Sequence, residues 1–348
     1  MSALAHYAAA AGEAVHVFAD GDKHAARFDT AENTAYRITR FGGLKPLRRR
    51  VKGAAIAKSI TKDDYIFADS WKSLEHLPSG LGVPVIAYAH GNEYPHMKDG
   101  RYPKQARIRN ALSKAAHLIA VSRDTAARTQ PFLPAGLTPQ IIHPPVEPAA
   151  PASRADIDYA QKLWPKPHAL RLLALCRLIE WKGIDRAIHA LKQLTDEGLD
   201  AQLVIAGIGD DRARLESITG ELKLTDRIVF AGRVEGGRKS ALYSSADIYV
   251  QPGRSINGQH EGFGITYIEA ALHGLPSLSG QAGGAPDACI DGKTGLVIEA
   301  SQLDNVSAGL RQLITDKHKR ARMSTAAKAH GEAALWPRQI ERILALKN

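Results

Sequence analysis

The most informative stretch of this chain, residues 260–276, reads HEGFGITYIEAALHGLP. It holds two glutamates separated by seven residues, Glu261 and Glu269, with a Gly-Phe-Gly turn directly after the first. The turn predicts the start of a helix, whose backbone N–H groups and positive dipole end can bind an anion. We expect Glu269 about one turn inside that helix, where its carboxylate can accept hydrogen bonds from hydroxyl groups.

Two cations lie upstream of this stretch, after a predicted strand over 172–176. Arg177 and Lys182 follow the C-terminal end of that strand, where two positive charges can neutralise a diphosphate. Downstream, Gly283 and Gly284 indicate a further loop at a strand end. Together these residues point to one class of ligand, a nucleoside diphosphate attached to a sugar.

Strand-like and helix-like segments alternate along the chain, which predicts parallel sheets covered by helices on both faces. The expected strands are 14–19, 36–40, 65–68, 84–89, 118–121, 140–142, 172–176, 202–206, 227–230 and 247–250. The expected helices are 3–11, 47–60, 103–115, 123–130, 183–197, 212–222, 238–244 and 266–272. Two successive sets of this kind predict two doubly wound α/β domains that face each other, with the ligand site in the cleft between them.

The proline-rich segment 143–151 predicts the boundary between the two domains, because proline fixes φ and removes a backbone donor. We therefore expect a first domain over 1–150 and a second domain over 151–332. A last helix over 336–346 is a candidate for packing back on the first domain.

The composition is that of an ordinary globular protein, with 348 residues of which 44% are hydrophobic and 24% charged. It excludes an intrinsically disordered chain, a collagen-like fibre and a small disulfide-stapled module. The two cysteines, Cys176 and Cys289, lack metal-ligand spacing, so we expect a reducing compartment and no thiolate zinc site. The sequence shows neither a signal-peptide pattern nor an apolar window of about 18 residues, so we expect a cytoplasmic protein.

The net charge is +10, and most of it lies in the first half of the chain. Residues 1–150 contain 20 Lys and Arg against 13 Asp and Glu, whereas residues 151–348 contain 26 against 23. Such an excess fits nucleic acid, an anionic membrane or an acidic substrate, and charge alone does not choose between them. Because the sequence shows no aromatic–basic platform and no reading helix, we expect no nucleic-acid partner.

The basic stretch 44–60 has two interpretations. Its cations are interleaved with apolar residues, Lys45, Arg48, Arg49, Arg50, Lys52 and Lys58 with Leu44, Leu47, Val51, Ala55 and Ile56. It can lie as an amphipathic helix on an anionic membrane and so bring the protein to a lipid-linked acceptor. Alternatively its apolar side packs on the sheet of its own domain. We favour the second interpretation, because every helix of a doubly wound domain needs an apolar face.

Over residues 170–300 the order and spacing of motifs resemble the retaining glycosyltransferases of family 4, which have the GT-B fold of two facing Rossmann-like domains. The matching elements are Arg177 with Lys182-Gly183, residues 204–209, 230–234 and 246–252, the pair Glu261 and Glu269, and residues 291–297. The first half of the chain resembles the family more weakly.

The resemblance implies a hexosyltransferase of bacterial cell-envelope polysaccharide or glycolipid synthesis. Such an enzyme moves a sugar from a UDP or GDP donor to a hydroxyl of a glycan or lipid-linked acceptor, and the anomeric configuration is retained. In the family's usual front-face reaction the leaving phosphate itself deprotonates the acceptor hydroxyl. No Asp-x-Asp triplet precedes the site, and Arg177 with Lys182 can replace a divalent ion, so we expect no metal and no cofactor.

The resemblance also implies roles for individual residues. Arg177 and Lys182 hold the donor diphosphate, and Glu269 binds the ribose hydroxyls. Glu261 lies against the donor sugar, as does His90, which follows a strand of the first domain. Glu261 and His90 are thereby the candidate catalytic residues.

Further residues complete the implied donor site. The backbone N–H groups of Phe263, Gly264 and Ile265 contact sugar or phosphate, and the loop at Val234 passes the nucleobase. Gly207 belongs to one of the matching strand ends, although Gly-x-Gly by itself is common in α/β proteins.

One feature departs from the family. Residues 3–19 resemble its first helix and second strand, so we expect the opening strand and its glycine-rich loop to be absent. Either the chain starts late or the first sheet closes around the gap. Because that strand is central in a doubly wound order, an alternative function is a sugar-nucleotide-binding protein without transfer activity.

Overall fold

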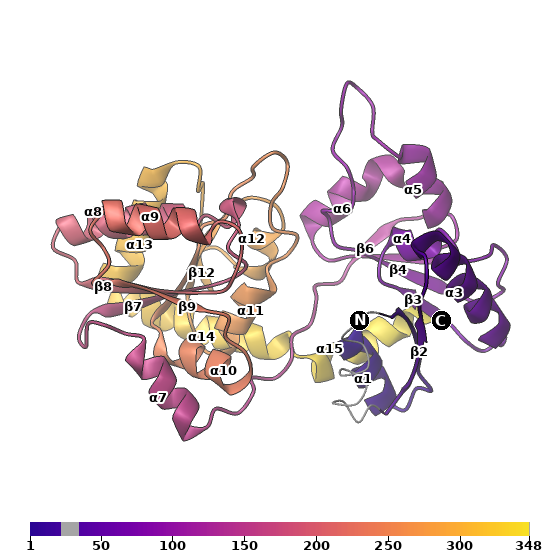
Figure 1. Ribbon diagram of the computed structural model, residues 1–348, viewed down its shortest axis with the longest axis horizontal. Helices are drawn as coiled ribbons and strands as arrows, with labels where there is room; N and C mark the ends of the chain where they lie inside the picture. Colours follow the sequence, from indigo (N-terminus) through magenta and orange to yellow (C-terminus); the bar gives the residue numbers. More distant parts are fainter. Residues whose placement is uncertain (22–34, 348) are drawn as a thin grey trace. The chain divides into compact units, whose positions relative to one another are not determined.

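The computed structural model describes residues 1–21 and 35–347, and the fold divides into two compact units (Figure 1). The first unit comprises Met1–His143 together with the C-terminal segment from Trp336, and the second comprises Pro144–Leu335. The segment after His143 pairs with the second unit, since the Val146 N–H donates to the Ala334 carbonyl at 3.0 Å. The second unit therefore begins a few residues before the expected boundary at 151.

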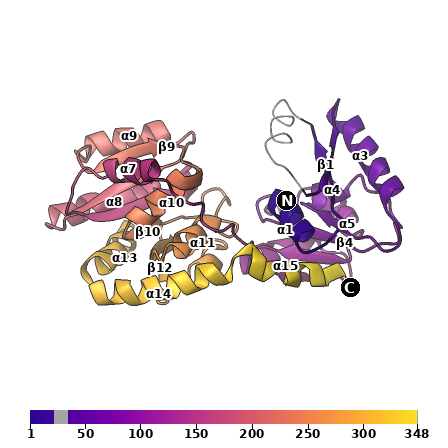
Figure 2. The same cartoon turned by 90° about the horizontal axis from the view of Figure 1, so that it is seen from below.

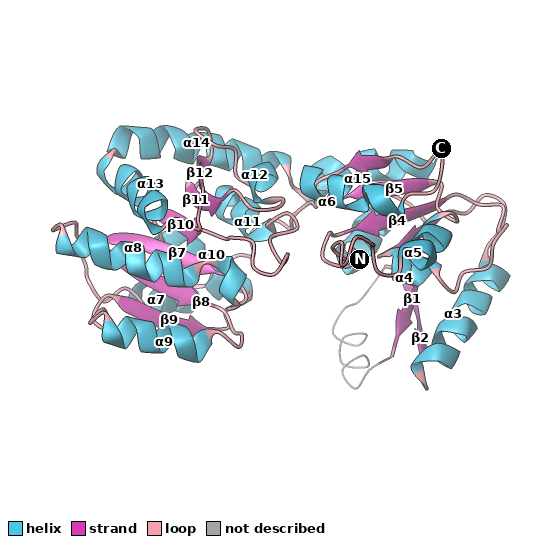
Figure 3. Cartoon of the chain, turned by 90° about the horizontal axis from the view of Figure 1, so that it is seen from above, coloured by secondary structure: helices cyan, strands magenta, loops and turns pink. Residues whose placement is uncertain are grey.

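The second unit is built on one six-stranded parallel sheet in the order β12-β11-β10-β7-β8-β9 (Figure 3). Its strands are β7 Leu170–Leu175, β8 Ala201–Ala206, β9 Ile228–Gly232, β10 Ile248–Gln251, β11 Ser277–Gly280 and β12 Gly295–Ile298. Its helices are α7 Arg154–Lys162, the 3-10 helix η2 Glu180–Lys182, α8 Ile184–Asp196, α9 Arg212–Glu221, α10 Gly236–Ser245, α11 Ile265–Leu272, α12 Ala285–Ala288, α13 Leu303–Thr315 and α14 Lys317–Ala333. Figure 1 shows α8, α9 and α13 on one side of the sheet and α7, α10 and α14 on the other, which is the expected doubly wound arrangement.

The strands β11 and β12 and the helices α13 and α14 are missing from the expected elements. The β11 sequence, Ser-Leu-Ser-Gly, has no run of β-branched or aromatic residues. All four of its residues are nevertheless buried, because β11 pairs with β10 on one side and β12 on the other. β11 is buried because of its neighbours in the sheet, so its own sequence carries little indication of a strand.

The first unit contains two separate parallel sheets among the residues that the structure describes. One runs in the order β3-β4-β5-β6, and the other consists of β1 and β2 alone (Figure 3). The strands are β1 His16–Asp20, β2 Arg37–Phe41, β3 Ile66–Ala68, β4 Val85–Ala89, β5 His117–Ala120 and β6 Pro139–Ile141. The helices are α1 Ser2–Ala10, α3 Lys45–Ser59, α4 Trp71–Leu74, α5 Gln105–Leu112, α6 Arg123–Thr129, η1 Gln130–Phe132, α15 Trp336–Leu344 and η3 Ala345–Lys347.

The absence of the opening strand, expected from the sequence, therefore corresponds to a break between two sheets in the described residues. Of the two alternatives given for the gap, closure of one sheet around it is wrong for the described residues, because β1 and β3 lie in different sheets. A strand pairs with a neighbour only where their backbone groups come into register, and within residues 1–21 and 35–347 β1 finds that register with β2 alone.

The C-terminal helix α15 packs in the first unit beside α1, as Figure 2 shows. The ring of Trp336 stacks on that of Tyr7 at a centroid distance of 5.5 Å and an interplanar angle of 6°. In the same C-terminal segment, the Lys347 Nζ donates to Glu13 Oε1 at 2.6 Å. This hydrogen bond is the chief reason why the pKa of Glu13 lies below its ordinary value.

Helix α3 exposes much of its apolar side. Leu44, Leu47 and Val51 are 80%, 63% and 50% exposed, whereas only the far end of the helix, at Ile56, packs against a core cluster. The favoured expectation that the apolar side of 44–60 packs on its own domain is therefore wrong for those three residues. The side of α3 that bears Lys52 faces Asp20 instead, with Lys52 Nζ at 2.8 Å from the Oδ1 atom.

Candidate functional site

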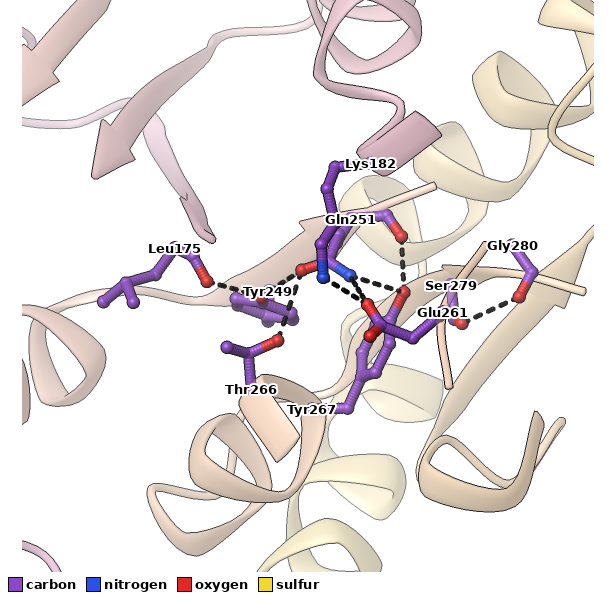
Figure 4. A network of polar contacts seen from close by, with 9 residues as sticks. All are labelled: Leu175, Lys182, Tyr249, Gln251, Glu261, Thr266, Tyr267, Ser279 and Gly280. Carbon is purple, nitrogen blue, oxygen red and sulfur yellow. Dashed lines mark hydrogen bonds and ion pairs between the residues drawn. The ribbon is translucent and has the colours of Figure 1, made fainter. Parts of the chain in front are cut away.

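The centre of the candidate site is an ion pair between Lys182, at the end of η2, and Glu261 (Figure 4). The two side chains are 10% and 13% exposed, so both charges are largely withdrawn from water. Gln251, the last residue of β10, donates from Nε2 to the same Glu261 oxygen, Oε2, at 2.8 Å. Charges buried to this degree are costly unless paired and hydrogen-bonded, and here each requirement is met.

The side chain of Gln251 is fully buried and its orientation is set by its neighbours. Its Oε1 accepts hydrogen bonds from the Tyr249 hydroxyl at 2.9 Å and the Thr266 hydroxyl at 3.2 Å. The amide nitrogen must then face Glu261. Burial raises the pKa of Tyr249 well above its ordinary value, so this hydroxyl remains a donor. Gln251 thus joins β10, the start of α11 and the Glu261 loop, as Figure 4 shows.

A second, buried ion pair fixes the turn that carries Lys182. Arg254 donates to both oxygens of Asp185, at 2.8 and 2.9 Å, and both side chains are 11% exposed. The Arg254 backbone N–H also donates to the Trp181 carbonyl at 2.9 Å. These contacts hold η2 and the start of α8 against the loop that follows β10.

The predicted helix after the Gly-Phe-Gly turn is α11, which begins at Ile265. Gly264 is its N-cap with φ +98°, and a Cβ added there would lie 2.4 Å from the ring of Tyr267. The same position lies 3.3 Å from Glu261 Cγ, so the Glu261 side chain lies close to the start of α11. Phe263 is buried and Ile265 is 45% exposed, which leaves the first turn accessible beside Glu261.

Glu269, one turn inside α11, belongs to a separate cluster. Its two oxygens accept from the Lys239 ammonium at 2.8 Å and the Tyr243 hydroxyl at 3.1 Å, both on α10. Burial, and secondarily the Glu269 charge, raise the pKa of Tyr243 well above its ordinary value. The two glutamates of the motif are therefore each held by a lysine from a different element.

The remaining expected donor residues of the second unit lie at strand ends. Arg177, after β7, is exposed and forms no ion pair among residues 1–21 and 35–347. Gly207, after β8, has φ +136°, and a Cβ there would lie 1.8 Å from the Cys176 carbonyl oxygen. Val234, after β9, is 8% exposed. Burial raises the pKa of the Cys176 thiol to about 12, so this cysteine is not a reactive thiolate.

His90 belongs to the first unit and follows β4. Its Nε2 lies 3.0 Å from the Asp69 carbonyl oxygen, and its backbone N–H donates to Glu93 Oε1 at 2.6 Å. The imidazole stacks on the ring of Tyr88 at 6.1 Å. His90 is thus an exposed, oriented side chain that follows the end of a strand of the first unit.

Five residues of this site have no role assigned from the sequence: Asp185, Lys239, Tyr243, Gln251 and Arg254, of which Gln251 lies within the matching stretch 246–252. Gln251 and Arg254 follow the predicted strand 247–250, and this position after the end of a strand was the signal that could have identified them. Lys239 and Tyr243 lie on a predicted helix with no feature that distinguishes them from solvated residues.

In the part of the chain that the structure describes, no group of three or more His, Cys, Asp or Glu could hold a metal ion. Across the same residues, no helix combines the length and the apolar character needed to cross a bilayer.

Two protein families match the chain. The family "Glycosyl transferases group 1" matches residues 160–330, and "Glycosyltransferase Family 4" matches residues 1–150. The two matches follow the division into a first and a second half.

Characterised relatives cover part of the chain. A GDP-mannose-dependent monoacylated alpha-(1-6)-phosphatidylinositol monomannoside mannosyltransferase of Corynebacterium glutamicum is 37% identical over 159 residues, which are 45% of this chain and 41% of the relative. A GDP-mannose-dependent alpha-(1-6)-phosphatidylinositol monomannoside mannosyltransferase of Mycobacterium tuberculosis is 29% identical over 199 residues, 57% of this chain and 50% of the relative. The chain therefore spans half or less of the length of these relatives.

Solved structures resemble the whole chain in fold. Anabaena HepE in complex with UDP and glucose has a TM-score of 0.76 at 20% identity, covering 99% of this chain and 95% of its own. A glycosyltransferase from Rickettsia africae has a TM-score of 0.80 at 16% identity, covering 99% and 92%. At these identities the likeness establishes the two-domain fold.

Proposed function

Because this chain belongs to the group 1 glycosyltransferases, with the GT-B fold, we propose that it transfers a sugar from a nucleoside diphosphate to a hydroxyl of a glycan or lipid-linked acceptor. The second unit binds the donor and the first unit binds the acceptor. The product belongs to a bacterial cell-envelope polysaccharide or glycolipid.

One observation carries this proposal: the cluster of Lys182, Gln251 and Glu261 beside the first turn of α11. A cation, a helix N-terminus and an oriented carboxylate lie together beyond the C-terminal ends of parallel strands, where ligands of such sheets bind. The cation and the helix end suit a diphosphate, and the carboxylate suits the hydroxyls of an attached sugar.

The proposed reaction retains the anomeric configuration. The bond between the anomeric carbon and the diphosphate breaks, the acceptor oxygen bonds to the same face, and the leaving phosphate oxygen takes the acceptor proton. Lys182, Arg177 and the first turn of α11 stabilise the charge that develops on the diphosphate, so the protein needs no divalent ion. Glu261 and His90 position the donor sugar, and Glu269 holds the ribose.

We take GDP-mannose as the first donor to test, because the two mannosyltransferase relatives are GDP-mannose-dependent. A thermal-shift panel of GDP, UDP, GDP-mannose and UDP-glucose should raise the melting temperature only for the donor nucleotide and its sugar, since a ligand that binds the folded state stabilises it. Arg177→Ala and Glu269→Ala should reduce the shift. The proposal fails if no nucleotide shifts the transition, or if both variants respond like the natural chain.

We further propose that the protein works at the cytoplasmic face of the membrane through α3. The exposed side chains of Leu44, Leu47 and Val51 lie among cations of the same helix, which suits an anionic lipid surface. Co-sedimentation with phosphatidylglycerol vesicles should fall in Leu47→Ser with Val51→Ser, and neutral phosphatidylcholine vesicles should bind weakly. Equal binding of the variant and the natural chain would contradict the proposal.

A second candidate function, nucleotide-sugar binding without transfer, is favoured by the break between β1 and β3 in the first unit. The donor cluster lies wholly in the second unit and does not depend on that break. Acceptor-dependent release of GDP or UDP from a sugar donor by this chain would remove the second candidate. Donor binding without any release would favour it.

A further inference from the structure

Lys182 is engaged before any ligand arrives. Its ammonium forms an ion pair with Glu261, and the same ammonium lies 4.6 Å from the centre of the Trp181 ring. A diphosphate that binds Lys182 therefore competes with this carboxylate for the ammonium and weakens the ion pair by drawing the ammonium toward the phosphate oxygens. The cost is large for a pair this buried, because separation leaves a carboxylate with little solvent around it.

We infer that the Lys182–Glu261 pair discriminates the intact sugar donor from the spent nucleoside diphosphate, an inference that rests on the proposed donor site. When the intact donor binds, its phosphate takes Lys182 and its sugar hydroxyls donate to Glu261, so both members of the pair regain partners. When the nucleoside diphosphate alone binds, Glu261 loses Lys182 and gains no hydroxyl. The pair thus weakens binding of the product and favours its release.

Gln251 decides how large this penalty is. Its Nε2 stays bonded to Glu261 Oε2 whether or not Lys182 has left, because Tyr249 and Thr266 hold its amide in place. It is a positioning residue that keeps one hydrogen bond on the carboxylate during the exchange. Removing it should make Glu261 depend more strongly on Lys182.

Substitutions of Glu261 and of Gln251 should therefore change the affinity for the nucleoside diphosphate in opposite directions. In Glu261→Gln, Lys182 no longer has a carboxylate partner, so the affinity for the nucleoside diphosphate should rise about tenfold. The affinity for the sugar donor should rise less or fall, so the preference for the donor shrinks. In Gln251→Met the affinity for the nucleoside diphosphate should fall by about threefold. The Tyr249 hydroxyl keeps a partner in this variant, since it also lies 2.9 Å from the Leu175 carbonyl.

Calorimetric titration of GDP, UDP, GDP-mannose and UDP-glucose into the full chain and its variants tests the inference. Glu180→Gln is the matched control, because Glu180 lies on the same turn but is 57% exposed and should change affinity less than about twofold. Melting temperatures show that each variant is folded. The inference is overturned if Glu261→Gln leaves nucleoside diphosphate affinity unchanged or weakens it, or if Glu180→Gln tightens it equally.

Lys182→Met separates this inference from the proposed function. If the natural chain binds a nucleoside diphosphate and Lys182→Met does not weaken it, the placement of the diphosphate is wrong, and both proposals fail. If Lys182→Met weakens binding while Glu261→Gln does not tighten it, the donor site stands and only the discrimination by the pair is wrong.

Discussion

Strand β8 of the second unit and strand β1 of the first unit differ in how deeply they are buried. In the second unit every residue of strand β8 is buried, because a paired strand lies on each side of it and helices cover both faces. In the first unit none of the five residues of β1 is buried, and among the described residues β1 pairs with β2 alone. The comparison teaches that burial in a parallel sheet depends on a strand's neighbours as much as on its own residues.

The largest expected effect contrasts two glycines with positive φ, one in each unit. Gly207→Ala should lower the free energy of unfolding of the second unit by about 4 kcal/mol or more, since the new Cβ meets the Cys176 carbonyl. Gly12→Ala should cost about 1 kcal/mol, because Gly12 has φ +93° but no atom within 4 Å of the added Cβ. Urea denaturation of both variants measures the difference, and equal losses would contradict the contrast in packing.

The next effect compares strand side chains. Leu203→Ala on β8, where Leu203 is 1% exposed, should cost about 3 kcal/mol through lost burial and the cavity left behind. Ile38→Ala on β2, which is only partly buried, should cost about 1 kcal/mol. Hydrogen exchange resolved by peptide would report each unit separately. A larger loss from Ile38→Ala would show that the two-stranded sheet is packed as tightly as the six-stranded one.

A smaller effect compares an ion pair from each unit. Arg254→Met should destabilise the second unit by about 2 kcal/mol, because among the described residues it leaves the buried Asp185 with only the more distant Arg214, at 3.7 Å. Lys52→Met in the first unit should have a far smaller effect, since its partner Asp20 is 42% exposed and keeps Arg48 at 3.0 Å. Thermal unfolding of the two variants gives the ranking, and the reverse order would be inconsistent with the burial of Arg254.

The smallest effect concerns pH and the attachment of the C-terminal segment in the first unit. Because the pKa of Glu13 is lowered in the folded chain, its contribution to stability is complete above its ordinary pKa and is lost as the pH falls through the lowered value. Glu13→Gln should therefore be less stable near neutral pH and lose less stability in acid. Melting curves between pH 6 and 3 test this, with parallel curves as the contrary result.

The sequence by itself determined the elements whose signals are local. The Gly-Phe-Gly turn placed the start of α11 within one residue, and apolar runs such as 202–206 located β8. It missed β11, since a short strand of serine and glycine carries no periodic signal. The family resemblance selected Lys182, Glu261 and Glu269 as site residues and implied the part of the donor that each would bind, but it did not give their partners within the protein.

Only the tertiary structure decided those contacts. Lys182 and Glu261 are 79 residues apart and meet because β7 and β10 are neighbours in the sheet, which brings the loops after both strands to one edge. The same strand order brings Gln251, at the end of β10, within hydrogen-bonding distance of the Glu261 carboxylate. The break between β1 and β3 and the exposed side of α3 likewise depend on which elements find partners. The physical reason is common to all three: periodicity and turns are encoded within a few residues, whereas pairing depends on the order of strands in the whole sheet.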